Sequence, residues 1–340
     1  MQKKLKRPLI VLNEKRHYCP KAGLYIDPWK PVEQAVITHA HSDHARPGMK
    51  SYLSHHQSRE ILKYRLGEAI NLETMAYGQV LKVNGVKISL HPAGHIPGSA
   101  QVRLEDRGEI IVVSGDYKTE DDGLCDPFEV VKCHTFISES TFGLPIYKWE
   151  AQKSIFEGIN QWWASNAMEG RCSVIFAYSL GKAQRILHHL NLDIGKVYTH
   201  GAIWNTNEAL SANGLELPPT ERVTTEIPKS SFRKALILAP PSAMGTPWMR
   251  KFAPYRTAMC SGWMNIRGTR RRRGVDVGFV LSDHADWEGL NQAISGTGAD
   301  NIYLTHGFNE TFAKYLSEKH LNALALETLY TGESIDSGDD

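Results

Sequence analysis

The chain has 340 residues, 41% of them hydrophobic, so it can bury one large core or two moderate ones. Its formal net charge of +2 excludes a strong overall field that would attract a polyanion, although local charge can still do so. No apolar run approaches the roughly 18 residues that span a bilayer, so we expect no membrane segment.

The cysteines form neither a disulfide framework nor a Cys-x-x-Cys pair, because they are odd in number and widely scattered: Cys19, Cys125, Cys133, Cys172 and Cys260. This pattern favours a reducing compartment. The basic residues 1–8 are followed by an apolar stretch, 9–12, that is too short for a secretion signal. We therefore expect a cytoplasmic protein.

The first 140 residues read as a series of strands. Apolar runs with strand character occur at 35–38, 80–83, 86–90, 100–104, 110–114 and 135–138. At the end of the first run, residues 39–44 read His-Ala-His-Ser-Asp-His. Burying so many polar groups without partners is costly, which favours a metal site over the alternative of a His-rich surface turn.

The spacing in this stretch suggests two metal ions. Because a strand turns alternate side chains to one face, His39 and His41 can point at one ion. Asp43 and His44 lie beyond the strand end and can face a second ion. Two coordination spheres need further ligands, and His95 in a Gly/Pro loop and Asp116 after the run 110–114 are the candidates. Taken alone, either of these could be a turn residue.

The middle of the chain has an α/β pattern. Helical periodicity covers 150–164 and 182–190, whereas 174–177 and 235–239 are typical of buried parallel strands. A cationic run then follows, with Arg267, Arg270, Arg271, Arg272 and Arg273. Guanidinium groups pair well with phosphates, so this run is a candidate nucleic-acid contact; the alternative is a solvated loop.

The motifs resemble those of the metallo-β-lactamase superfamily, whose His-x-His-x-Asp-His motif, later His and later Asp correspond to residues 39–44, His95 and Asp116. The resemblance implies an αββα sandwich. Asp27 resembles the first family motif, an Asp that supports the metal-binding histidines without ligating the metal; alone it would be a turn-forming Asp-Pro.

Beyond residue 136 the chain resembles the β-CASP branch, whose members process nucleic acids. Glu139 lies in a segment similar to motif A, residues 281–286 resemble motif B with His284, and residues 303–307 resemble motif C with His306. The implied organisation is a metallo-β-lactamase domain over 1–143, an inserted α/β β-CASP domain over 144–280, and a return over 281–340 that ends in an acidic tail.

The resemblance implies a role for each site residue. One ion is assigned to His39, His41 and His95, the other to Asp43, His44 and His306, with Asp116 as the bridge. His284 is the candidate general acid, Glu139 would hold its imidazolium, and Asp43 is counted with the catalytic residues as well as the ligands. Imidazole and carboxylate ligands fit two Zn²⁺ ions, with Mn²⁺ as the alternative.

Within the branch, the chain looks most similar to the bacterial ligase-associated DNA exonucleases. This implies a two-metal DNA exonuclease in DNA repair, acting on DNA that is single-stranded or has a free end, with a DNA ligase and a helicase as partners. His306 departs from the Artemis-like DNA enzymes, which have Val there, and matches the RNA-directed members. An RNA-processing ribonuclease is therefore the alternative, followed by a small-molecule metallo-hydrolase and a non-catalytic nucleic-acid-binding module.

Overall fold

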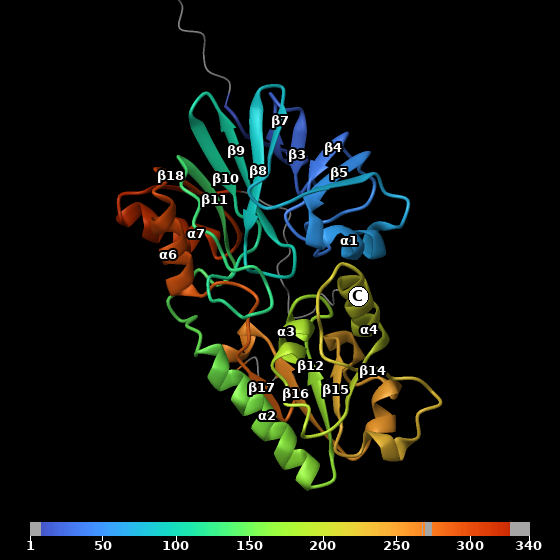
Figure 1. Ribbon diagram of the computed structural model, residues 1–340. Helices are drawn as coiled ribbons and strands as arrows, with labels where there is room; N and C mark the ends of the chain where they lie inside the picture. The colour runs from blue at the N-terminus through green and yellow to red at the C-terminus, as the bar shows by residue number, and fades with distance from the viewer. Residues whose placement is uncertain (1–7, 267, 269–273, 327–340) are drawn as a thin grey trace, which may run out of the picture. The chain divides into compact units, whose positions relative to one another are not determined.

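The computed structural model describes residues 8–266, 268 and 274–326 (Figure 1). These residues form two compact units. The first unit contains 8–121, 125–145 and 287–326, and the second contains the described residues of 122–124 and 146–286. The arginines at 267 and 270–273, which we singled out as a candidate nucleic-acid contact, lie outside the described residues.

One sheet of the first unit runs in the order β1–β2–β3–β4–β5–β6. Its strands are β1 (Val11–Asn13), β2 (Arg16–Cys19), β3 (Leu24–Ile26), β4 (Gln34–Val36), β5 (Ser51–His55) and β6 (Leu72–Met75). β3 to β6 pair in parallel. The carboxyl ends of β3 and β4 therefore meet at one edge of the sheet, where the chain continues into Asp27 and into residues 37–44.

The other sheet of this unit runs in the order β19–β18–β11–β10–β9–β8–β7. Its strands are β7 (Val80–Val83), β8 (Val86–Pro92), β9 (Ala100–Asp106), β10 (Glu109–Val113), β11 (Thr135–Ser140), β18 (Asn301–Gly307) and β19 (Asn322–Ala325). β7 to β10 form an antiparallel meander, whereas β10, β11, β18 and β19 pair in parallel. The carboxyl ends of β10, β11 and β18 thus bring Asp116, Glu139 and His306 to one edge.

The two sheets share a hydrophobic core. Leu24, Ile26 and Val36 of the first sheet pack in one cluster with residues of the second sheet such as Leu90 and Val102. Alternate side chains of a strand point to opposite faces, so each sheet can turn one face to this core. α6 (Trp287–Thr297) and α7 (Asn309–Glu318) pack on the β11–β18–β19 part, and α1 (Arg59–Leu66) follows β5.

The structure corrects one expectation about the site. We expected the strand at 35–38 to lead directly into His39 and His41, so that strand alternation would align them. β4 instead ends at Val36. The Thr38 N–H donates to Asp27 Oδ1 at 2.8 Å, and the Thr38 carbonyl accepts from Ala100 N at 2.8 Å. Because these backbone groups are bound outside the ladder, residues 37–44 form a loop, and the loop places the histidines.

The second unit contains a parallel sheet in the order β14–β13–β15–β12–β16–β17. Its strands are β12 (Cys172–Phe176), β13 (Val197–Thr199), β14 (Glu221–Arg222), β15 (Leu236–Ala239), β16 (Tyr255–Cys260) and β17 (Val277–Phe279). The parallel pairing of β12 with β15 confirms the prediction of buried parallel strands at these positions.

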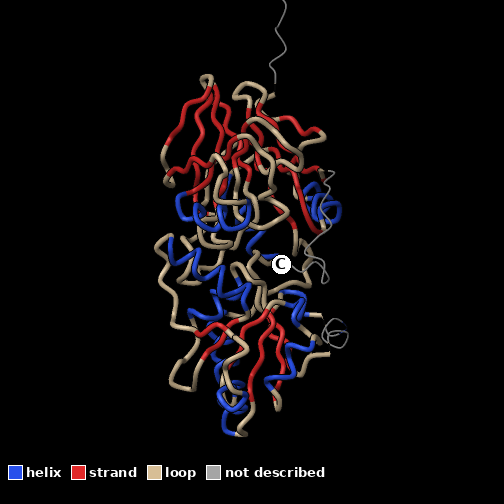
Figure 2. The backbone as a smooth tube through the Cα atoms, turned by 90° about the vertical axis from the view of Figure 1, so that its right-hand side faces the viewer, coloured by secondary structure: helices blue, strands red, loops and turns tan. Residues whose placement is uncertain are grey.

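Both faces of this sheet are covered (Figure 2). Ile175 of β12 packs with α2 (Gln152–Met168), α3 (Lys182–His188) and α4 (Gly201–Ala212), whereas its neighbours Val174 and Phe176 pack on the opposite face with Phe232 and Phe252. This explains why these strands are continuously apolar. The α/β class predicted from the sequence is confirmed. Among the described residues, none of the helices has both the length and the apolarity to cross a bilayer.

Candidate metal centre

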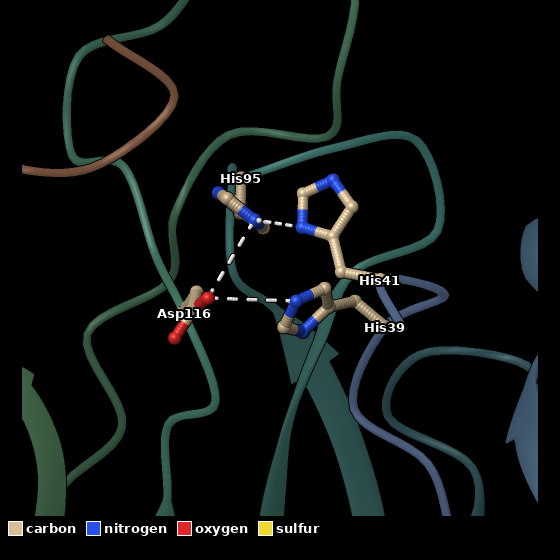
Figure 3. Close-up of side chains that lie close together, drawn as sticks. All are labelled: His39, His41, His95 and Asp116. Carbon is tan, nitrogen blue, oxygen red and sulfur yellow. Dashed lines mark hydrogen bonds and ion pairs between the residues drawn. The ribbon is translucent and has the colours of Figure 1, made fainter. Parts of the chain in front are cut away.

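His39, His41, His95 and Asp116 form one group of potential metal ligands (Figure 3). All of these side chains are buried, and their ligand atoms lie within 4.8 Å of one another. Asp116 Oδ2 is 3.5 Å from His39 Nε2 and 3.9 Å from His95 Nε2, and His95 Nε2 is 3.1 Å from His41 Nδ1. The grouping is the one that the sequence assigned to the first ion.

Asp43, His44, Asp116 and His306 form another such group. His44 Nε2 lies 3.5 Å from Asp116 Oδ2 and 3.5 Å from Asp43 Oδ2, and His306 Nδ1 lies 3.3 Å from Asp116 Oδ1. Asp43 is the more accessible member, with 35% of its side chain exposed. Asp116 belongs to both groups, as expected for a carboxylate that bridges two ions.

Asp27 and Thr38 orient two of the histidines from behind. Asp27 Oδ2 lies 2.8 Å from His44 Nδ1 and accepts from Thr38 Oγ1 at 2.7 Å. Thr38 Oγ1 in turn lies 3.1 Å from His39 Nδ1. With Nδ1 bound in this way, each ring turns Nε2 towards Asp116. Asp27 thus occupies the supporting position that its motif implied, whereas Thr38 was not singled out from the sequence although it directly precedes His39.

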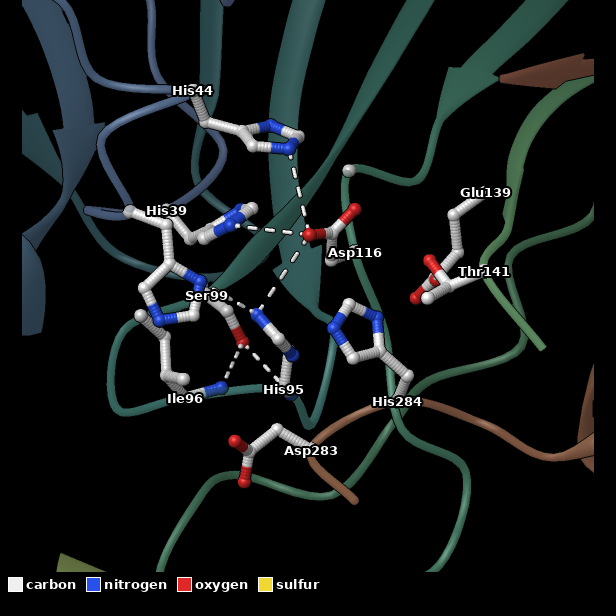
Figure 4. A network of polar contacts seen from close by, with 12 residues as sticks. His39, His44, His95, Ile96, Ser99, Asp116, Glu139, Thr141, Asp283 and His284 are labelled. Carbon is white, nitrogen blue, oxygen red and sulfur yellow. Dashed lines mark hydrogen bonds and ion pairs between the residues drawn. The ribbon is translucent and has the colours of Figure 1, made fainter. Parts of the chain in front are cut away.

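The loop before β9 places His95. Ser99 Oγ accepts the backbone N–H groups of His95 at 3.0 Å and Ile96 at 3.2 Å, which closes the loop around the histidine (Figure 4). Gly94 has φ +71°, and a Cβ atom there would lie 2.3 Å from the Lys118 carbonyl oxygen. Only glycine therefore allows the close approach of this loop to the segment that follows Asp116.

Asp116 is held by its neighbours on β10 and β11. The preceding Gly115 has φ +59°, and a Cβ there would lie 2.7 Å from Thr38. Glu139, at the end of β11, accepts from Tyr117 N at 2.7 Å and from Thr141 Oγ1 at 2.5 Å. The buried Glu139 thereby fixes the backbone next to Asp116.

The electrostatics of the cluster favour a cation at its centre. Burial opposes a charge on His44, yet the carboxylates of Asp116 and Asp43 raise its pKa to about 10. Burial likewise opposes the charge of Asp116, but the His44 imidazolium and hydrogen bonds hold the pKa of Asp116 well below its usual range. His39 lies in the same field, and burial and the His44 charge keep its pKa well below the ordinary histidine value. The carboxylates thus stabilise positive charge.

The donor set fits a divalent metal such as zinc. Zinc binds imidazole nitrogen at about 2.0–2.1 Å in a tetrahedral arrangement, which puts neighbouring ligand atoms roughly 3.3–3.4 Å apart. The 3.5 Å separations between Asp116 Oδ2 and Nε2 of His39 and His44 are close to that spacing. Both of these Nε2 atoms are buried without a hydrogen-bond partner, a costly arrangement that an ion would relieve.

The sequence missed Arg16. This buried side chain donates to the Asp27 carbonyl oxygen at 3.2 Å and lies 2.8 Å from His306 Nε2. The contact with His306 joins residues 290 positions apart, and no signal in the sequence marks it.

His284 belongs to the second unit, in a segment held by buried ion pairs. Arg185 NH1 donates to the Ser282 carbonyl oxygen at 3.2 Å and pairs with Asp283, and its Nε pairs with Asp122. The His284 carbonyl accepts from Trp149 Nε1 at 3.0 Å. The backbone around His284 is therefore fixed, and the catalytic roles of His284 and Glu139 stay predictions.

Relatives of the chain include both DNA- and RNA-related proteins, although no protein-family model matches it. A probable DNA ligase of Opitutus terrae is 28% identical over 312 residues, which cover 91% of this chain and 30% of that protein. Endoribonuclease YSH1 of Saccharomyces cerevisiae is 31% identical over 118 residues, covering 34% of this chain and 15% of that protein. The transcription termination factor FttA of Pyrococcus abyssi is 26% identical over 221 residues, covering 51% of this chain and 33% of that protein.

This chain therefore spans a third or less of the length of these relatives. A solved structure of a protein of unknown function from Enterococcus faecalis V583 has a similar fold. Its TM-score is 0.60 at 11% identity, over 88% of this chain and 80% of that chain. The sequence relatives are metallo-β-lactamase proteins of one branch, and the chain described here belongs with them to the β-CASP branch of the metallo-β-lactamase superfamily.

Proposed function

We propose that the protein is a metal-dependent phosphodiesterase that hydrolyses nucleic acid, with DNA as the preferred substrate. The observation that carries this proposal is the pair of ligand clusters that share Asp116. We further propose that the first unit is the αββα sandwich of the superfamily and the second unit its β-CASP domain, with functional domains over 1–143, 144–280 and 281–340.

Two divalent ions, Zn²⁺ or alternatively Mn²⁺, would activate water at neutral pH and neutralise phosphate oxygens. His39, His41 and His95 would hold one ion, Asp43, His44 and His306 the other, and Asp116 would contact both. Asp27 and Thr38 keep the Nε2 lone pairs of His44 and His39 directed inwards, because their oxygens occupy Nδ1. The protein thus orients its ligands before any ion binds.

The leaving oxygen of a phosphodiester needs a proton, and we propose that His284 donates it. An imidazole with an ordinary pKa near 6.5 can exchange a proton at neutral pH. Arg185 and Trp149 fix the backbone on either side of the ring through Ser282 O and His284 O. Glu139 would support the charged ring, in addition to its bond to Tyr117 N.

The choice of DNA rests on the extent of the likeness. The relative named a probable DNA ligase aligns with 91% of this chain, whereas the endoribonuclease YSH1 aligns with 34%. An exonuclease acting in DNA repair on single-stranded or free DNA ends, with a DNA ligase and a helicase as partners in the cytoplasm, would agree with that likeness. RNA is the second candidate, because the His at position 306 is typical of RNA-directed members of the branch.

The experiment compares end-labelled single-stranded DNA with RNA of the same sequence. Metal-stripped protein is assayed before and after Zn²⁺ or Mn²⁺ is restored. We expect stepwise shortening of DNA from one end, only with metal. Preferential cleavage of RNA would move the assignment to the ribonuclease alternative. Cleavage of neither polymer by fully metal-loaded protein would contradict the proposal.

A further inference from the structure

Arg16 contacts the second cluster directly. It is 3% exposed and begins β2. One guanidinium nitrogen, NH2, lies 2.8 Å from His306 Nε2, and the other, NH1, donates to the Asp27 carbonyl oxygen at 3.2 Å. Its Cζ lies 5.5 Å from the centre of the Trp29 ring. The buried cation is thus bound by an imidazole, a carbonyl and an aromatic face.

The backbone at this contact is strained. Arg16 has φ 97°, Asp27 has φ 45° and His306 has φ 58°. L-residues rarely adopt positive φ, and such residues persist only where the surrounding fold imposes them. Arg16 pairs with Asn13 at the turn of the β1–β2 hairpin, a position that glycine often fills. The fold therefore presents Arg16 to His306 despite the backbone cost.

The contact determines which nitrogen of His306 carries a proton. A guanidinium group has only donors, so Nε2 must accept from Arg16. In a neutral imidazole the proton is then on Nδ1, which lies 3.3 Å from Asp116 Oδ1 and donates to it. A protonated nitrogen cannot bind a metal, because ligation requires the lone pair.

For His306 to ligate through Nδ1, its proton would have to move to Nε2. That proton would then face the donors of Arg16, so Arg16 has to withdraw first. If the ring ligated through Nε2, the ion would compete with the guanidinium directly. In both cases an ion at the second cluster loses a charge-assisted hydrogen bond and meets a fixed positive charge.

The first cluster has a different arrangement. His39 Nδ1 lies against the hydroxyl oxygen of Thr38, an oxygen that can accept its proton, and His39 Nε2 faces Asp116. Its lone pair is therefore directed towards the ion position in the metal-free protein. The two clusters share a carboxylate, but only one of them has its histidine in competition with an arginine.

We propose that Arg16 is a positioning residue that keeps the second metal site in a low-affinity state. The protein binds one divalent ion tightly through His39, His41, His95 and Asp116. It binds the second ion only when Arg16 releases His306. The availability of the second ion, and with it full activity, is thereby set by a residue that ligates neither metal. This inference rests on the proposed function, since it takes both clusters as metal sites.

The test is a stepwise Zn²⁺ titration of metal-stripped protein against a chromophoric chelator. The wild type should bind the first ion more tightly than the second. Arg16→Met removes charge and donors at similar length and should tighten the second site roughly 10- to 100-fold, in line with the worth of a hydrogen bond to a charged group. The first site should change less than twofold. Arg16→Lys, which keeps the charge, should tighten the second site less than Arg16→Met.

Arg107→Met is the matched control, because Arg107 is also a hairpin arginine of the first unit with positive φ, but it is exposed. It should titrate as the wild type does. Equal affinity of both sites in the wild type, or an unchanged second site in folded Arg16→Met, would overturn the inference and leave the proposed function intact. Absence of tight metal binding altogether would overturn both.

Nitrogen-15 NMR of the histidine rings provides a measurement on the wild type alone. We expect His306 of the metal-free protein as the Nδ1–H form, still present after one equivalent of Zn²⁺ and lost when the second ion binds. An Nε2–H form in the metal-free protein would contradict the role of Arg16.

Discussion

Asp27→Asn should weaken metal binding although Asp27 is not a ligand. The carboxylate makes three contacts, with His44 Nδ1 at 2.8 Å, Thr38 Oγ1 at 2.7 Å and Thr38 N at 2.8 Å. If the asparagine oxygen faces Thr38 N, its NH₂ group faces His44 Nδ1. Nδ1 must then accept, and the His44 proton moves to Nε2, the atom that should bind the ion. In the opposite orientation, two N–H groups meet at Thr38.

Loss of a group that orients a metal-binding histidine typically costs 10- to 100-fold in affinity, which is about 1.4–2.7 kcal/mol. We expect this loss at the site that contains His44, measured by chelator competition on protein whose fold is checked by near-ultraviolet circular dichroism. The site of His39, His41 and His95 should lose less, because it feels Asp27 only through Thr38.

Asp106→Asn is the control, since Asp106 forms a partly exposed ion pair with Lys21 at 2.6 Å in the same unit. It should leave both metal affinities unchanged and alter the free energy of unfolding by at most about 1 kcal/mol. Wild-type metal affinity in folded Asp27→Asn would refute the reasoning that the Asp27 carboxylate selects the His44 proton position.

The other predictions concern the bridge, the proton donor, the cationic run and the second unit. Asp116→Ala should abolish cleavage and lower metal content, measured by atomic emission, because both clusters lose a ligand; full turnover with full occupancy would contradict this. His284→Ala should keep its metal but lose roughly 10²- to 10⁴-fold in rate, partly restored by a better leaving group; loss of an ion would make His284 a ligand. Two alanines within residues 270–273 should lower the slope of log affinity against log salt by roughly 0.7 per lost contact on single strands, and an unchanged slope would indicate a solvated loop. Arg185→Met should lower the free energy of unfolding by about 3–5 kcal/mol because it leaves buried carboxylates unpaired, whereas the exposed pair removed by Arg256→Met is worth at most about 1 kcal/mol; equal urea midpoints for the two variants would contradict this.

Residue chemistry at strand ends made the ligand groups predictable. His95, Asp116 and His306 each follow an apolar run, and parallel strands bring their carboxyl ends to one edge of a sheet. The α/β class and most strands followed from the same patterns. The structure groups the sequence-assigned ligands within 4.8 Å of one another, as a shared metal centre requires.

The sequence could not predict how these residues are oriented. The strand alternation that we expected at His39 and His41 is absent, because Asp27 and Ala100 take the backbone groups of Thr38. Arg16 could not be found either, since its backbone conformation and its contact with His306 depend on the completed fold. Sequence patterns report local periodicity and residue chemistry, whereas proton positions depend on contacts between distant segments.

The central claim is that the cluster of His39, His41, His95 and Asp116 holds a metal ion in the active protein. The most direct test is anomalous X-ray diffraction at the zinc absorption edge, on crystals of zinc-reconstituted protein with demonstrated nuclease activity. The account predicts an anomalous peak within bonding distance of these four side chains, with a weaker peak, or none at low zinc, at the cluster of Asp43, His44 and His306. Active, zinc-dependent protein with no peak at the first cluster would contradict it.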